Sequence, residues 1–240
     1  MYLGDEARMP YGPRPAAEVL AFTRQAMRWF AGWDCKLVVL ACNTATAVAL
    51  ESVREESPAP VLGVIRPGAA AAIAASSRRA VGVLATAGTV RSGSYVRALR
   101  DLDPLVDVVQ QACPALVPLV EAGKADTDEA EAAIRGYLEP LLSEGAVVAP
   151  AVDTLLLGCT HCPLLRERLR RVAGPGVRVV DSAATTALAV REVLESHGLR
   201  REGDSGAGQL FATGPVARFQ GIARAIFGGD PQLVERTELA

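Results

Sequence analysis

The chain has 240 residues, half of them hydrophobic, and its 25 Lys and Arg against 27 Asp and Glu give a formal net charge of −2. A chain of this length and composition can bury one large core or two smaller ones, which excludes an intrinsically disordered protein. It has no basic stripe with interleaved aromatic residues, so nucleic acid is not expected as the primary partner. No apolar segment reaches the roughly 20 residues that cross a bilayer, so we expect no membrane association.

The five cysteines are an odd number, and the first residues carry no charged region followed by an apolar stretch, as a secretion signal does. We therefore expect reduced thiols and a cytoplasmic location. With two histidines and a single CxxC, the chain offers too few ligands for a typical zinc site, so no metal is expected.

Short aliphatic runs alternate with helix-like segments along the chain. This alternation predicts an α/β fold with parallel, doubly wound sheets. The strand-like runs cover residues 37–41, 61–65, 80–86, 106–110, 154–158, 177–181 and, more weakly, 209–213. The helix-like segments cover residues 16–30, 45–55, 69–76, 92–101, 128–143, 164–172, 183–197 and 215–227. Pro and Gly cluster at 66–68 and 173–176, which are plausible breakpoints between two domains.

Two segments, 36–45 and 153–162, read almost as copies of each other. In each, an aliphatic run ends in a small residue, and a cysteine follows, Cys42 in the first and Cys159 in the second. Such a run is typical of a parallel strand buried on both faces. The end of that strand is where α/β sheets bind ligands, and a helix N-terminus there stabilises a thiolate. Two such thiols from two related halves suggest one substrate held between two acid/base groups.

The first of these cysteines is followed by an amide and a hydroxyl, in Cys42-Asn43-Thr44. One interpretation is an acid/base thiol beside donors for a substrate carboxylate. The other is a buried cysteine followed by an ordinary helix N-cap. The segment alone does not decide between the two.

The second cysteine opens a CxxC, Cys159-Thr160-His161-Cys162. It is compatible with a thioredoxin-like dithiol, with a zinc site, or with an acid/base Cys159 tuned by His161, in which Cys162 is incidental. We favour the third, because only it explains why Cys42 recurs in a matching setting.

Other residues carry weaker signals. Cys35 and Cys113 lack such a context, and we expect both to be structural. Thr86 and Thr89 follow a predicted strand, where hydroxyls and helix amides bind a carboxylate or serve as ordinary caps.

Taken together, these motifs give the chain a strong resemblance to the glutamate racemases of the aspartate/glutamate racemase superfamily. The matching segments occur in family order and cover nearly the whole chain. They are residues 2–5, 10–12, 41–45, 113–114, 117–121, 158–161 and 181–183.

The resemblance implies two pseudo-symmetric, doubly wound α/β domains with mostly parallel sheets and the active site in the cleft between them. The first domain would hold residues 1–66 and 176–240, and the second residues 67–175. The implied activity is cofactor-independent, two-base racemisation of glutamate, which supplies D-glutamate for peptidoglycan. Family members often dimerise, so a homodimer is an expected assembly.

The resemblance also assigns roles to single residues. Cys42 would take the α-proton from D-glutamate and Cys159 from L-glutamate, each acting as acid when the other is base. His161, supported by Glu121, would assist Cys159. The residues implied to contact the substrate are Tyr11, Gly12, Asn43, Thr44, Thr160 and His161, and Thr86 and Thr89 join them as candidates.

Three alternatives stay open at this point. One is a racemase for a related substrate, such as aspartate or a hydantoin. Another is an inactive homologue that binds an amino acid or a protein partner. The last is a dithiol oxidoreductase, which would depend on Cys162 and be indifferent to Cys42.

The sequence departs from the family pattern in two places. Cys162 stands where the family usually has an aromatic residue. The family also begins with a strand and an Asp-Ser-Gly turn, whose Asp assists the first cysteine, whereas the resemblance here begins at the second strand. We hypothesise that Met1 is a misassigned start or that the chain is truncated; an upstream stop codon with no such turn would refute the first version.

Overall fold

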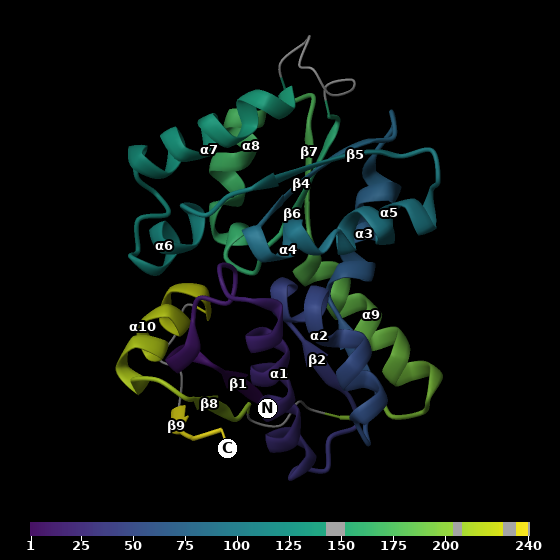
Figure 1. Ribbon diagram of the computed structural model, residues 1–240, viewed down its shortest axis with the longest axis vertical. Helices are drawn as coiled ribbons and strands as arrows, with labels where there is room; N and C mark the ends of the chain where they lie inside the picture. The colour runs from purple at the N-terminus through teal and green to yellow at the C-terminus, as the bar shows by residue number, and fades with distance from the viewer. Residues whose placement is uncertain (143–151, 204–207, 228–233, 240) are drawn as a thin grey trace.

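The structure is a computed structural model, and it describes residues 1–142, 152–203, 208–227 and 234–239. Figure 1 shows two groups of elements, one above the other, with both chain termini in the lower one. The lower group contains β1 (Tyr2–Gly4), η1 (Glu6–Arg8), α1 (Ala16–Ala31), β2 (Val38–Leu40), α2 (Asn43–Glu56), β3 (Val61–Gly63), α9 (Ser182–Ser196), β8 (Leu210–Ala212), α10 (Val216–Phe227) and β9 (Val234–Arg236). The upper group contains α3 (Ile65–Ala75), β4 (Ala80–Ala85), α4 (Ala87–Ser92), α5 (Ser94–Leu102), β5 (Asp107–Ala112), α6 (Leu116–Glu121), α7 (Asp128–Leu142), β6 (Thr154–Gly158), η2 (Cys162–Leu165), α8 (Arg166–Ala173) and β7 (Arg178–Asp181).

The upper group is built on a parallel sheet with the strand order β5-β4-β6-β7. Every residue of β4 and β6 is buried, as expected for strands covered on both faces. Successive side chains alternate between two cores: Leu155 and Leu157 pack among residues of α6, α7 and α8, whereas Leu156 packs with α3 and α5. The aliphatic run that predicted this strand therefore also explains why helices cover both faces.

The described strands of the lower group form two parallel sheets, β1-β8-β9 and β2-β3. In the first, Leu3 pairs with Phe211, which joins the two ends of the chain. In the second, Val39 pairs with Leu62, and a small core of Leu40, Ala49 and Val53 lies between β2 and α2.

All seven predicted strands are present, but two further strands were missed. β1 and β9 have three residues each and show no apolar alternation that would mark them. The helix expected at 92–101 corresponds to α5, and α4 just before it was not predicted. Gly93, whose φ of 65° lies in the left-handed region, separates the two helices.

The cluster at 66–68 proved to be helical and is not a loop between domains. Pro67 and Gly68 lie near the start of α3, where a proline is tolerated because the first amides of a helix have no intrahelical acceptor. The chain passes from the lower to the upper group just before this helix.

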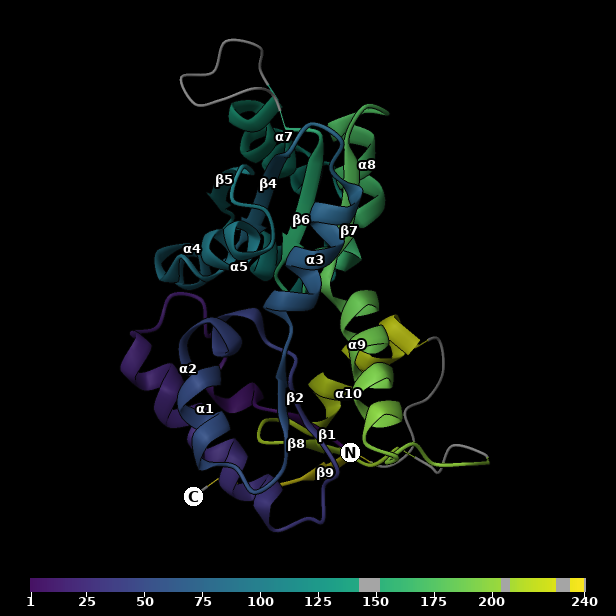
Figure 2. The ribbon, with the colours of Figure 1, turned by 90° about the vertical axis from the view of Figure 1, so that its right-hand side faces the viewer.

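The predicted domain ranges remain a prediction, with one change. β7 hydrogen-bonds to β6 and so belongs to the upper sheet, although 176–240 was expected to lie in the first domain. We therefore place the proposed return crossing between Asp181 and Ser182, where α9 begins and leads into the lower group (Figure 2). Within the described ranges, none of the helices combines the length and apolar character needed to cross a bilayer.

Candidate active site

Cys42 lies at the N-cap position of α2, immediately after β2, with its backbone extended. Its side chain is partly buried. Burial raises the pKa of the Cys42 thiol, and the nearby Cys159 adds to this effect. The amides of Ala45 and Thr44 at the start of the helix oppose the shift without reversing it. Cys42 therefore rests as a thiol that can give up a proton to a strong base.

Cys159 follows the last residue of β6 and is buried. The turn after it is tight: the Cys162 amide donates to the Cys159 carbonyl at 3.1 Å, and η2 begins there. A hydrogen bond from the Cys162 thiol lowers the pKa of Cys159, and His161 lowers it further, so that together they outweigh burial. Because a thiolate is the stronger base, Cys159 is poised to accept a proton.

The two cysteines thus have pKa values shifted in opposite directions. They interact electrostatically, as the effect of Cys159 on the Cys42 thiol shows. Two titratable groups whose surroundings push their pKa values apart form an acid/base pair. The arrangement therefore favours loss of the proton from Cys159 and its retention on Cys42.

A line of polar contacts supports Cys159. Its Sγ lies 3.8 Å from His161 Nδ1, and His161 Nε2 lies 2.6 Å from Glu121 Oε1. Burial lowers the pKa of His161, but Cys159 and Glu121 raise it by more. Arg218 of α10 donates to the other Glu121 oxygen at 2.9 Å, so this line reaches into the lower group.

Three threonine hydroxyls meet where the two groups touch. Thr44 lies 2.9 Å from Thr86 and 3.3 Å from Thr89, and the latter two are 3.1 Å apart. Thr86 is also the N-cap of α4, because its hydroxyl accepts from the Thr89 amide. Thr86 therefore both caps α4 and takes part in a hydroxyl cluster with Thr44 and Thr89, all three of which we had predicted as candidate site residues.

Gly12 comes into close contact with α4. The Gly88 amide donates to the Gly12 carbonyl at 2.9 Å. A Cβ at Gly12 would lie 2.8 Å from Thr86 Cβ, and one at Gly88 would lie 2.7 Å from the Gly12 carbonyl oxygen. Neither position has room for a side chain without a shift of its neighbour.

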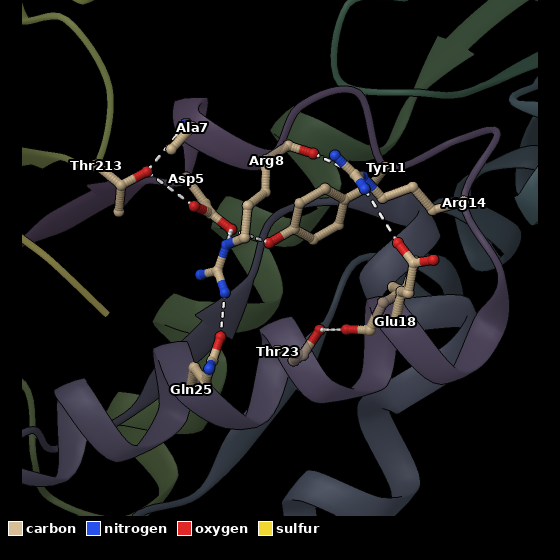
Figure 3. Close-up of polar contacts among 10 residues, drawn as sticks. Asp5, Ala7, Arg8, Tyr11, Arg14, Glu18, Thr23, Gln25 and Thr213 are labelled. Carbon is tan, nitrogen blue, oxygen red and sulfur yellow. Dashed lines mark hydrogen bonds and ion pairs between the residues drawn. The ribbon is translucent and has the colours of Figure 1, made fainter. Parts of the chain in front are cut away.

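Tyr11 is held by a network in the first loop (Figure 3). Its hydroxyl donates to Asp5 Oδ2, while Thr213 donates to Asp5 Oδ1 at 2.8 Å and Arg8 Nε lies 2.7 Å from Oδ2. Burial and the bond to Asp5 raise the pKa of Tyr11, so its proton stays on the phenol. Because that proton is already donated to Asp5, Tyr11 fixes the shape of the loop that carries Gly12.

Asn43 is buried, and its Oδ1 accepts a hydrogen bond of 2.6 Å from the Tyr95 hydroxyl of α5. Its Nδ2 is buried and has no hydrogen-bond partner in the part of the chain that the structure describes. Thr160 is exposed beside Cys159.

Sequence reasoning missed several of these contacts. Cys162 was expected to be incidental, but its thiol lies close enough to Cys159 to lower the pKa of that residue. Asp5 belonged to a matching segment without an assigned role, and no local pattern singled out Arg218 or Tyr95. Cys113, expected to be structural, lies in the same core cluster as Cys159, and burial raises its pKa to about 12.

Among the residues described, no three His, Cys, Asp or Glu side chains lie close enough together to hold a metal ion.

The chain is similar to known racemases in sequence. Residues 1–190 match the model of the Asp/Glu/Hydantoin racemase family. A glutamate racemase of Lactiplantibacillus plantarum is 42% identical over 229 residues, which cover 95% of this chain and 82% of that protein. One from Shouchella clausii is 45% identical over 93% of this chain and 79% of its own length.

Solved structures agree. Glutamate racemase from Bacillus anthracis superposes with a TM-score of 0.93 at 36% identity, over 99% of this chain and 87% of that one. Glutamate racemase from Francisella tularensis, solved in complex with D-glutamate, gives a TM-score of 0.89 at 25% identity, over 99% and 86% of the two chains. The two-group architecture, the paired cysteines and these matches lead to one conclusion: the chain belongs to the Asp/Glu/Hydantoin racemase family.

Proposed function

We propose that the protein interconverts L- and D-glutamate by a two-base mechanism that uses Cys42 and Cys159. The observation that carries this proposal is the placement of the two thiols at the ends of equivalent strand-to-turn segments, Cys42 after β2 and Cys159 after β6, and the opposite directions of their pKa shifts agree with it. Glutamate is favoured as the substrate because relatives that match more than nine tenths of this chain at above 40% identity are glutamate racemases.

In the proposed reaction from L-glutamate, the Cys159 thiolate removes the α-proton as the C–H bond breaks. The electron pair passes into the α-carboxylate, and the Cys42 thiol then gives its proton to the opposite face of the carbon. D-glutamate leaves, and the enzyme holds a Cys159 thiol and a Cys42 thiolate. The reverse reaction, or proton exchange with water, restores the starting form.

We propose that the supporting residues stabilise charge on both sides of this transfer. His161 would stabilise the thiolate form of Cys159, and Glu121 would keep the imidazole of His161 oriented. The unpartnered Asn43 amide and the Thr44, Thr86 and Thr89 hydroxyls offer donors for the substrate carboxylates. Gly12 would approach the substrate through its backbone, and the exposed Thr160 would contact it beside Cys159. Preorganised donors of this kind stabilise developing negative charge without a cofactor.

The cellular setting is part of the proposal. Reduced thiols suit the cytoplasm, where D-glutamate for peptidoglycan would be supplied. A homodimer is the assembly that we propose to test, by light scattering of the purified chain.

The test is proton NMR of L- and D-glutamate in D2O, which follows loss of the α-proton signal. Exchange from both enantiomers with interconversion supports the proposal. The Cys159→Ser variant should lose exchange from L-glutamate, and Cys42→Ser should lose it from D-glutamate. Cys35→Ser is the matched control, since this thiol lies outside the site, and it should retain both exchanges. If the wild-type chain exchanges neither enantiomer, the proposed function is wrong.

A further inference from the structure

Tyr95 of α5 is completely buried, and its hydroxyl donates to Asn43 Oδ1 at 2.6 Å. Asn43 is the residue after Cys42, so this bond joins the upper group to the start of the helix that carries the thiol. Ser182 at the start of α9 also lies beside the phenol, where it partly offsets the rise that burial causes in the pKa of Tyr95. A phenol has a single proton, and an amide oxygen can only accept, so that proton lies between Tyr95 and Asn43 Oδ1.

The Tyr95 ring is fixed by close packing on the strand that leads to Cys159. A Cβ at Gly158 would lie 2.7 Å from Tyr95 Cε2, and one at Gly68 would lie 3.4 Å from the Tyr95 hydroxyl oxygen. The ring therefore occupies space that only glycine leaves open, and its hydroxyl has little freedom to move.

The bond to Tyr95 determines which end of the Asn43 amide is left over. A side-chain amide has one acceptor oxygen and one NH2 donor, and here the oxygen is occupied. The remaining Nδ2 is buried without a partner among the described residues. Buried polar groups almost always find a partner, so a free one beside a reactive thiol indicates that a ligand supplies it.

We propose that Tyr95 is a positioning residue, which holds the Asn43 amide so that Nδ2 donates to a carboxylate oxygen of the amino-acid substrate. The inference rests on the proposed function for the identity of the substrate. Without the phenol, the amide is free to rotate by half a turn about its last torsion. It would then direct its oxygen at the substrate carboxylate, and two acceptors facing each other repel.

Tyr95→Phe removes the hydroxyl and keeps the ring that fills the space next to Gly158. We expect KM for glutamate to rise about tenfold, with a much smaller change in kcat, because a hydrogen bond to a charged group is lost in both ground and transition states. Tyr137→Phe is the matched control. Its hydroxyl accepts from the Ala115 amide, outside the proposed site, and KM should stay within about twofold of the wild-type value.

A double-mutant cycle with Asn43→Ala separates positioning from a general effect on the fold. If Tyr95 acts through the amide, Tyr95→Phe should change KM by less than about twofold once the amide has been removed. An equal loss in both backgrounds would overturn the proposal, as would an unchanged KM in the single variant. The same cycle can be measured by binding, as the shift that glutamate causes in the thermal unfolding midpoint of each variant. Because each variant is compared with itself, this measurement remains valid if Tyr95→Phe is less stable than wild type.

The wild-type chain distinguishes the two proposals. If it exchanges the α-proton of glutamate and the cycle is additive, only the role of Tyr95 is wrong. If glutamate neither loses its α-proton nor shifts the unfolding midpoint of the wild-type chain, the proposed function itself fails, and the assignment of Tyr95 to this substrate fails with it.

Discussion

Arg218 donates a hydrogen bond of 2.9 Å to Glu121 across the boundary between the two groups of elements, although 97 positions separate them. Glu121 holds His161 through its other oxygen, and His161 contacts Cys159. The electrostatic surroundings of one thiol in the upper group therefore depend on a helix of the lower group.

Arg218→Gln tests this dependence. Loss of a positive charge raises the pKa of nearby acids, including the Cys159–His161 pair, and the reaction from L-glutamate needs the Cys159 thiolate. We expect kcat/KM to fall about two- to fivefold near neutral pH, a modest effect because an exposed ion pair contributes little. The loss should shrink as pH rises. A racemase interconverts mirror images of equal free energy, so kcat/KM must change equally in both directions.

Two variants control this experiment. Arg218→Lys keeps the charge and should recover most of the activity. Arg191→Gln removes another exposed arginine from an ion pair, with Glu195 on α9, and should leave the pH profile unchanged. A uniform loss at every pH for Arg218→Gln would contradict the electrostatic explanation and indicate a change in packing.

The Cys162 thiol should set the working pH range of Cys159. Because Cys162 donates to the Cys159 sulfur, Cys162→Ala should raise the pKa of Cys159. The acidic limb of the kcat/KM profile should then move to higher pH, with about a tenfold loss for each unit of that shift at pH values below it. Cys162→Ser keeps a donor and should lose less.

Cys113→Ala is the control for the cavity that Cys162→Ala leaves. Cys113 is buried in the same core cluster, but its thiol contacts the Gln111 carbonyl at 3.5 Å. It should lower stability to a similar extent, by roughly 1 kcal/mol, with little change in the pH profile. Identical profiles for the two alanine variants would mean that the donor bond is unimportant.

The sequence was sufficient to predict the position of both cysteines, because the cause is local. A buried aliphatic strand followed by a small residue and a polar turn places Cys42 and Cys159 at strand ends. Thr86 and Thr89 could also be identified as candidates, since they follow a predicted strand, but their contact with Thr44 could not. Hydrophobic periodicity and turn residues are local features, so they can be identified in a single sequence.

Contacts between residues far apart in the chain could not be predicted in this way. Tyr95 lies on α5 four residues before Leu99, so it looked like one more core residue of a helix. Arg218 is an ordinary basic residue on an amphipathic helix until α10 is placed beside α6. β1 gains its strand conformation from pairing with β8, some 200 positions away, and its three residues carry no pattern of their own. In each case tertiary packing decides the role.

Asp153 should stabilise the fold in a pH-dependent way. Its carboxylate accepts from the Ser76 and Ser77 hydroxyls and from the Ser77 and Arg78 amides. Burial raises the pKa of Asp153, but these bonds lower it by more, to about 2. A folded pKa below the unfolded value of about 3.9 adds stability above that value, which disappears as pH falls towards 2.

Asp153→Asn should therefore lower the free energy of unfolding by about 2 kcal/mol at pH 7. The difference from wild type should narrow steadily from about pH 5 to about pH 2, because the folded and unfolded pKa values of Asp153 lie in this range. Urea unfolding at several pH values measures it. Asp101→Asn removes an exposed carboxylate and is the control. A difference that stays constant down to pH 2 would show that the charge of the Asp153 carboxylate does not stabilise the fold.

Gly12→Ala tests the contact between the first loop and α4. The added Cβ would meet Thr86 Cβ at 2.8 Å, and it would push the loop away from the Gly88 amide that the Gly12 carbonyl binds. We expect a loss of about 1–3 kcal/mol in stability from this overpacking. Activity should fall further than stability predicts, because Thr86 would be displaced from Thr44 in the hydroxyl cluster.

Gly136→Ala is the opposite case and the control for Gly12→Ala. It lies within α7, where a Cβ would meet nothing within 4 Å, and alanine is the better helix former. This variant should be more stable than wild type by roughly 0.5–1 kcal/mol and equally active. Thermal unfolding and racemisation kinetics of the two variants, measured side by side, check both signs. Full activity of Gly12→Ala would contradict this prediction. It would mean that the first loop can move away from α4 without disturbing the geometry around Cys42.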